Sequence, residues 1–180
     1  MESLRVPKPV DIRQTTFDGI LAMRTMHAQS WRDTYPNEEA GISKEWVNEW
    51  TAQWVTPESI EASKEYLKEA LTSPLHLHRL AVVDGEVVGL LHASKDEDKQ
   101  SLDALYLDKA YHGNGLADTL MRLALEWLDP TLPISLEVAT YNARAIAFYN
   151  RYGFGIQEGS EHMFRDKIPV ITMQREGVKS

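Results

Sequence analysis

The segment from residue 102 to residue 127 constrains the fold most strongly, because a strand, a tight glycine turn and a long helix follow one another directly. Leu102 to Leu107 is predicted to be a strand, and Gly113 and Gly115 allow the backbone to turn closely after it. The apolar residues that then recur at helical spacing are Leu120, Leu123, Ala124 and Trp127. The first N–H groups of such a helix lack intrahelical acceptors and carry the positive end of its dipole, so the turn is predicted to bind an anion, with a pyrophosphate as the natural occupant.

A second segment, from residue 134 to residue 154, combines a strand with a short helix. Ile134, Leu136 and Val138 alternate with less apolar residues, which predicts a strand with one apolar face. Asn142 is a good N-cap and Gly153 a good helix terminator, so a helix of about three turns is expected between them. Asn142 and Tyr149 are seven residues apart and fall on one side of that helix.

The glycine turn disfavours nucleotide hydrolysis and hydride transfer. It lacks the Gly-Lys-Ser/Thr ending of a P-loop, and the chain has no Gly-x-Gly-x-x-Gly fingerprint. His112-Gly113-Asn114-Gly115-Leu116-Ala117 instead resembles the acetyl-coenzyme A motif of the GCN5-related N-acetyltransferases (GNAT), whose pattern is Arg/Gln-x-x-Gly-x-Gly/Ala. His112 departs from the usual Arg or Gln. The segment from 134 to 154 resembles the second signature of the same family.

The resemblance, which is sharp from about residue 77 to 156, implies an α+β fold. Its sheet is mixed and largely antiparallel, is flanked by helices, and contains one splayed parallel strand pair that holds acetyl-CoA. Backbone groups of Leu105 and Leu107 would hold the pantetheine arm, and Asn142 would contact the same arm. The amides from 113 to 117 would hold the pyrophosphate. Arg151 either approaches the distal phosphate or is a solvated helix charge. The implied cofactor-binding residues are Leu105, Tyr106, Leu107, His112, Gly113, Asn114, Gly115, Leu116, Ala117, Asn142 and Arg151.

The implied reaction is attack of a primary amine on the acetyl thioester, which requires a base for the amine and an acid for the departing thiolate. Tyr149 occupies the family's usual acid position, and a phenol can donate a proton while neutral at pH 7. Glu137 lies twelve residues before Tyr149, as the base does in acetyltransferases of ribosomal-protein N-termini. Asp103 on the preceding strand is the alternative base, although an ordinary polar-face role is favoured for it.

Composition limits the other classes. A chain of 180 residues fits one domain spanning 1–180, and with no cysteine it has no disulfide, thiolate zinc site or cysteine nucleophile. The first residues show neither a secretion signal nor a membrane span, so a cytoplasmic protein without a membrane partner is expected. The net charge of −8 disfavours nucleic acid and weakly favours a cationic amine. The histidines lack metal-site spacing, and no metal is expected.

The remaining pattern predicts the order β-α-α-α-β-β-β-α-β-α-β-β. The expected early elements are a strand at 10–13, helices at 17–31, from 43 and at 57–71, and a hairpin of strands 78–83 and 86–93 joined by Asp84-Gly85. The expected last strands are 154–163 and 170–174. Trp46, Trp50 and Trp54 recur every four residues, which favours core packing or a homodimer face over a cation-binding cage.

The preferred function is therefore acetylation of a small primary amine. A polyamine leads, because the C-terminal half is loosely similar to bacterial spermidine/spermine acetyltransferases. The alternatives are a peptide or protein N-terminal acetyltransferase and a non-catalytic acyl-CoA-binding sensor.

Overall fold

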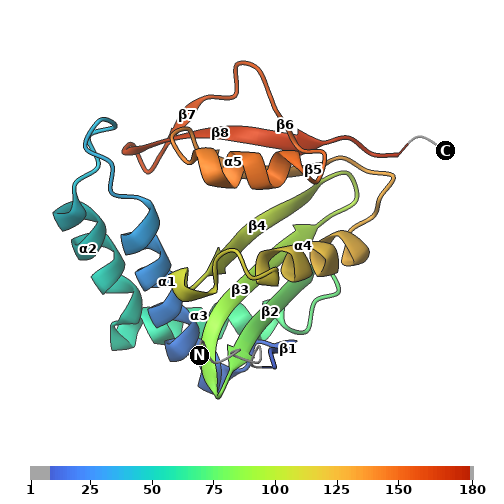
Figure 1. Cartoon of the computed structure of the whole chain (residues 1–180). Coiled ribbons are helices and arrows are strands. Elements are labelled where there is room, and N and C mark those ends of the chain that lie inside the picture. Colours follow the sequence, from blue (N-terminus) through green and yellow to red (C-terminus); the bar gives the residue numbers. More distant parts are fainter. Residues whose placement is uncertain (1–8, 179–180) are drawn as a thin grey trace, which may run out of the picture.

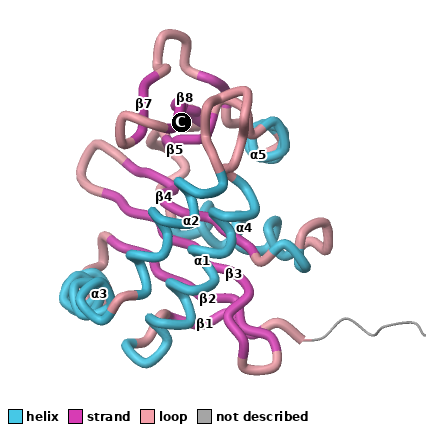
Figure 2. The backbone as a smooth tube through the Cα atoms, turned by 90° about the vertical axis from the view of Figure 1, so that its left-hand side faces the viewer, coloured by secondary structure: helices cyan, strands magenta, loops and turns pink. Residues whose placement is uncertain are grey.

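The computed structural model describes residues 9–178, which form one eight-stranded sheet with five α-helices around it (Figures 1 and 2). In chain order the elements are β1 Asp11–Gln14, α1 Ile20–Thr34, α2 Lys44–Ala52, α3 Pro57–Ala70, β2 His76–Val83, β3 Glu86–Lys95, β4 Gln100–Leu107, α4 Leu116–Trp127, β5 Ile134–Ala139, α5 Ala143–Asn150, β6 Gly155–Ile156, β7 His162–Phe164 and β8 Ile168–Arg175. No helix of this described part is long and apolar enough to cross a membrane.

The sheet confirms the predicted α+β class and its splayed strand pair. Its order is β1-β2-β3-β4-β5-β8-β6, with β7 also paired to β8, and every pairing is antiparallel except β4 with β5. That parallel pairing consists of Gln100 with Ile134 and Ser101 with Ser135. Beyond it the two strands diverge, as Figure 1 shows between β4 and β5. The later part of β4 and the later part of β5 therefore face each other without a shared ladder.

A buried side chain fixes the place where β4 and β5 pair. Gln100, 2% exposed, donates from Nε2 to the Asp129 carbonyl and accepts at Oε1 from the Asp129 N–H, both at 2.7 Å. The side-chain amide thus ties the start of β4 to the loop that leads into β5.

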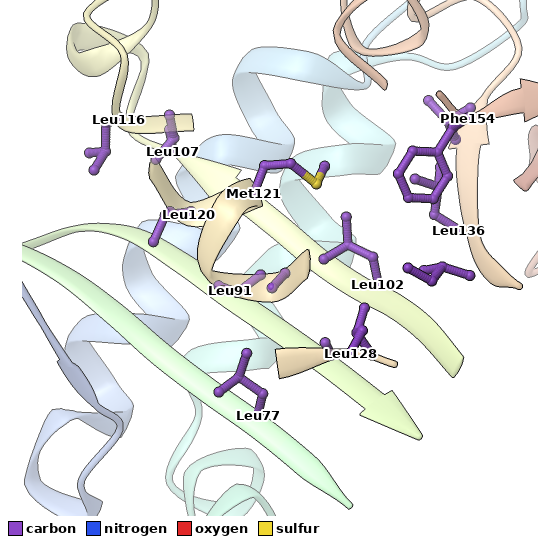
Figure 3. Packing of buried hydrophobic residues seen from close by; sticks show 14 of the residues in the cluster. Leu77, Leu91, Leu102, Leu107, Leu116, Leu120, Met121, Leu128, Leu136 and Phe154 are labelled. Carbon is purple, nitrogen blue, oxygen red and sulfur yellow. The ribbon is translucent and has the colours of Figure 1, made fainter. Parts of the chain in front are cut away.

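Helices cover both faces of the sheet, because apolar side chains of the central strands alternate between them. Leu91 and Ala81 belong to the cluster beneath α4, whereas Leu90 and Leu80 pack toward Met23 and Met26 of α1. Leu120 and Met121 of α4 are fully buried, and Figure 3 shows them over Leu91 and Leu102. Helices α4 and α1 thus pack on opposite faces of the strands that lead to the site.

Local signals place most element boundaries where the sequence predicts them. Ser43 accepts a hydrogen bond from the Trp46 N–H, and Asn142 accepts one from the Ala145 N–H. Asp84 and Gly85 have φ values of 52° and 83°, as the primed hairpin turn requires. Thr16 is an exception, because its side chain makes no capping bond and a single 3-10 turn precedes α1.

The sheet has irregularities that were not predicted. The expected strand 154–163 is two short strands, β6 and β7, separated by a turn in which Gly159 has a φ of 75°. On β4, Leu102 pairs with Ala93 and Ala104 with His92, so Asp103 is an extra residue in a β-bulge. The bulge lets Leu102 and Leu105 pack on the α4 side, while Asp103 stays exposed.

The tryptophan stripe, which consists of Trp46, Trp50 and Trp54, packs against the protein's own core. Trp46 and Trp50 stack with centroids 6.1 Å apart and are partly buried against a cluster that includes Val47, Ile168 and Val170. Cations from the turn between β7 and β8 also lie over these rings. This supports the core-packing interpretation of the stripe.

Candidate active site

A cleft of about 520 Å³ runs along the opening between β4 and β5, and this volume is within the size range of ligand sites. The predicted residues that line it are Leu105, Tyr106, Leu107, His112, Gly113, Gly115, Ala117, Glu137, Asn142, Tyr149 and Arg151, and Asp103 lines it too. Asn114 and Leu116 do not line the cleft. Three lining residues that sequence reasoning missed, Ser30, Thr34 and Tyr35, come from the end of α1.

The glycine turn forms the floor of one end of the cleft. Gly113 and Gly115 have φ values of 77° and 87°, which only glycine adopts readily, and a Cβ at either position would meet no atom within 4 Å.

The turn supplies several unpaired donors at the N-terminus of α4. Within residues 9–178, the N–H groups of Gly113, Gly115 and Ala117 donate to no protein acceptor. The Leu116 N–H differs from the prediction in detail, because it donates to the Asn114 Oδ1 at 3.1 Å. The arrangement therefore suits an anion such as a pyrophosphate, but the Leu116 N–H is not among its free donors.

Two arginines stand at this end of the cleft. Arg144 donates to the His112 Nδ1 at 2.5 Å, and burial together with this guanidinium lowers the pKa of His112 below its ordinary value. Arg151 lies 3.3 Å from the Asp118 Oδ1 and remains 63% exposed. Sequence reasoning missed Arg144. A basic residue in the first turn of a helix opposes the helix dipole, which was the signal that could have indicated an anion partner.

The end of β4 forms one wall of the cleft. The Leu107 carbonyl accepts a hydrogen bond from the buried Ser30 hydroxyl at 2.8 Å, so one of the predicted backbone contacts already has a protein partner. The Tyr106 ring packs toward α1, and its hydroxyl lies 2.9 Å from the Tyr35 hydroxyl. Leu105 is half-buried against the cluster beneath α4.

Helix α5 forms the other wall and carries Asn142 and Tyr149. The Asn142 Oδ1 caps the helix, which leaves its Nδ2 as a donor toward the cleft. The Tyr149 ring packs edge-on against Phe148 and Phe154, with centroids 5.4 and 6.0 Å away. Its hydroxyl has no hydrogen-bond partner in the described chain, and burial raises the pKa of Tyr149 well above its ordinary value. Tyr149 is therefore a neutral phenol with a free proton to donate at pH 7.

Two carboxylates face the cleft from the diverging strands. Glu137 on β5 is half-exposed, and its Oε1 lies 3.0 Å from the His162 Nε2. Asp103, the bulge residue of β4, accepts a hydrogen bond from the Ser101 hydroxyl. Both candidate bases thus line the same cleft as Tyr149 and the glycine turn.

Comparison with known proteins shows the family. Residues 41–154 match the acetyltransferase (GNAT) family model. Uncharacterized N-acetyltransferases of Mycobacterium bovis and Mycobacterium tuberculosis are 34% identical over 113 residues, which is 57% of this chain and 71% of theirs. The chain therefore belongs to the GNAT family and is an acetyl-CoA-dependent N-acetyltransferase.

Solved structures share the fold. The PaiA N-acetyltransferase from Thermoplasma acidophilum in complex with coenzyme A superposes with a TM-score of 0.68 at 20% identity, over 93% of this chain and 99% of that one. The NatC complex bound to Gag peptide and CoA contains a chain with a TM-score of 0.61 at 14% identity, covering 94% of this chain and 99% of its own.

Proposed function

We propose that the acceptor is a primary amine of a small cationic molecule, with a polyamine as the leading candidate. The observation that carries this proposal is the pair of carboxylates, Asp103 and Glu137, on opposite strands of one cleft. A molecule with two or more ammonium groups can place one at each carboxylate. The net charge of −8 adds a field that attracts such cations.

Acetyl-CoA occupies the rest of the cleft. The free amides of Gly113, Gly115 and Ala117 hold the pyrophosphate, Asn142 contacts the pantetheine arm beside β4, and Arg151 and Arg144 lie near phosphate oxygens. When bound, acetyl-CoA supplies an activated acetyl thioester whose leaving group is a thiolate.

The protein's own task in the reaction is to handle two protons. An alkyl ammonium with a pKa of about 10.4 is almost fully protonated at pH 7, and removing its proton costs about 4.6 kcal/mol. Glu137 binds the ammonium and accepts its proton as the general base. Tyr149, which is neutral and has a free hydroxyl, donates a proton or a hydrogen bond to the departing sulfur.

A peptide α-amine is the second candidate. Glu137 and Tyr149 have the spacing of the ribosomal-protein N-terminal acetyltransferases, and both line this cleft. An α-amine with a pKa near 8 costs only about 1.4 kcal/mol to deprotonate at pH 7, so it places a weaker demand on the base.

A panel of acceptors tests the proposal. Release of coenzyme A thiol from acetyl-CoA is measured with spermidine, spermine, aminoglycosides, amino acids and N-terminal peptides. The polyamines should give the highest kcat/KM. Turnover confined to the peptides would replace the polyamine with the second candidate, and equal turnover with neutral and cationic amines would remove the role of the carboxylates.

Two variants then separate the roles of the carboxylates. Asp103→Asn should raise the KM of a polyamine about two- to fivefold with little change in kcat, because an exposed ion pair contributes about 0.2–1 kcal/mol. Glu137→Gln should lower kcat much more than it raises KM. Loss of kcat in Asp103→Asn together with full activity in Glu137→Gln would exchange the two assignments.

A further inference from the structure

The side chain of His162 lies between two hydrogen-bond acceptors. Its Nε2 is 3.0 Å from the Glu137 Oε1, and its Nδ1 is 3.0 Å from the Ser160 carbonyl oxygen. A carboxylate and a carbonyl can only accept, so both contacts are hydrogen bonds only when both ring nitrogens carry a proton. The structure therefore has the geometry of the imidazolium–carboxylate pair, which is the state that forms once His162 has taken up a second proton.

The electrostatics agree with this geometry. The Ser160 carbonyl and the Glu137 carboxylate both favour the charged ring and raise the pKa of His162 above its ordinary value. Glu137 on β5 is the ionisable group that faces the ring from a neighbouring element. Val170, the register partner of His162 on β8, is uncharged, and Glu161 adjoins His162 in the chain.

The hairpin that carries His162 is anchored to the strand beside Glu137. Thr172 on β8 is the register partner of Glu137, and its N–H donates to the Ser160 hydroxyl oxygen at 3.0 Å. The Thr172 carbonyl accepts from the Gln157 N–H at 2.9 Å. Ser160 is thus held beside β8, and its own carbonyl in turn aims the imidazole across β8 at Glu137.

We propose that His162 is a positioning residue that acts through Glu137 and takes up the proton that the acceptor ammonium loses. This inference rests on the proposed role of Glu137 as the base. It makes His162 the final acceptor of the proton, and His162 lies outside both segments that resemble the family, 112–117 and 134–154.

The proton balance is as follows. At a pH above the pKa of His162, the state before transfer is an acceptor ammonium, a Glu137 carboxylate and a neutral His162 ring with its proton on Nδ1. One N–H bond of the ammonium breaks, Glu137 carries the proton, and an Nε2–H bond forms on His162. The amine keeps its electron pair for attack on the thioester, and the imidazolium returns the proton to water through its 45% exposed side chain.

An imidazole is the better final acceptor because its proton affinity lies closer to that of an amine. An ordinary imidazole has a pKa about two units above that of an ordinary glutamate carboxyl, which makes the transfer about a hundredfold more favourable. A base works best when its pKa is near the working pH.

The first test measures the pair without turnover. In histidine-labelled full-length protein, NMR titration gives the pKa of each of the six histidines, and His162→Gln identifies the His162 signal by its loss. The pKa of His162 should lie above 6.5 and should fall by about 0.5 or more in Glu137→Gln. An unchanged pKa in that variant would overturn the proposal.

The second test measures the pH dependence of kcat/KM. Glutamine at 162 can still donate to Glu137 but cannot take up a proton. At pH 8, His162→Gln should lower kcat/KM for the acceptor about 10- to 100-fold and leave the KM for acetyl-CoA unchanged. The ratio of wild-type to variant kcat/KM cancels ionisation of the acceptor, and it should rise with pH to a plateau with its midpoint at the NMR pKa of His162.

Control variants distinguish failure of this inference from failure of the proposed base. His76→Gln, a half-buried histidine on β2 remote from the cleft, should give a ratio that is flat with pH. In Glu137→Gln, adding His162→Gln should cause no further loss, because the two act as one unit. A flat ratio for His162→Gln with an impaired Glu137→Gln would leave Glu137 as the base and refute the role of His162. Full activity of Glu137→Gln would refute the base itself.

Discussion

Tyr149→Phe isolates the acid role because the hydroxyl is the only group removed. The ring contacts with Phe148 and Phe154 remain, and the hydroxyl has no partner within residues 9–178 that would be left unsatisfied. The free energy of unfolding should therefore change by less than about 0.5 kcal/mol. Because a thiol with an ordinary pKa of about 8.5 is a fair leaving group, the loss in kcat should lie at the lower end of general-acid effects, about 100-fold or about 2.7 kcal/mol.

Three measurements check this reasoning. Coenzyme A release at saturating concentrations of both substrates gives kcat, calorimetry gives the Kd of acetyl-CoA, and urea unfolding gives stability. Only kcat should change. Tyr152→Phe is the matched control, because the Tyr152 hydroxyl donates to the Asp118 Oδ1 at 2.5 Å. It should lose about 1 kcal/mol of stability and keep its kcat. Unchanged kcat in Tyr149→Phe would refute the acid role, and a matching loss of stability or affinity would show that the hydroxyl is structural.

Two further predictions concern the glycine turn and the buried histidines. Gly115→Ala forces alanine into a φ of 87° with no steric contact, so it should cost about 1–2 kcal/mol of stability or distort the turn, and should weaken acetyl-CoA binding at least tenfold. Gly85→Ala, with a φ of 83° in a remote hairpin and equally open space, should cost similar stability but bind acetyl-CoA normally, and equal affinities in the two variants would count against the cradle. Burial lowers the pKa of His27 to about 3 and of His78 to about 4, so below pH 6.5 the unfolded chain binds more protons and stability should fall by up to about 1.4 kcal/mol per pH unit for each histidine. A urea midpoint that stays constant between pH 7 and pH 5 would contradict this expectation.

Sequence was a good guide to features that depend on neighbouring residues. The Asn142 cap, the Asp84-Gly85 turn and the two left-handed glycines at 113 and 115 each follow from local backbone preferences. The family resemblance then supplied the splayed sheet, which periodicity alone does not indicate.

Contacts between distant segments were beyond that reasoning. The pairing of Glu137 with His162 and of Arg144 with His112 joins residues 25 and 32 positions apart, which no local pattern specifies. The Asp103 bulge depends on register with β3, and the break between β6 and β7 depends on how Ser160 bonds to β8. Each of these is decided by tertiary packing rather than by propensity.

The narrow junction at Gln100 joins the two halves of the sheet at one place, so the rest of β4 and β5 is free to separate. Within residues 9–178, strands β1–β4 and β5–β8 share only two residue pairs at that junction, and the buried amide of Gln100 holds them in place. A cosubstrate bound between the two halves would connect them, because it would bond to strand edges that the protein leaves unpaired. Amide hydrogen exchange along 102–107 and 136–139 should then slow together on acetyl-CoA binding, so that one molecule is both reactant and part of the scaffold for each catalytic cycle.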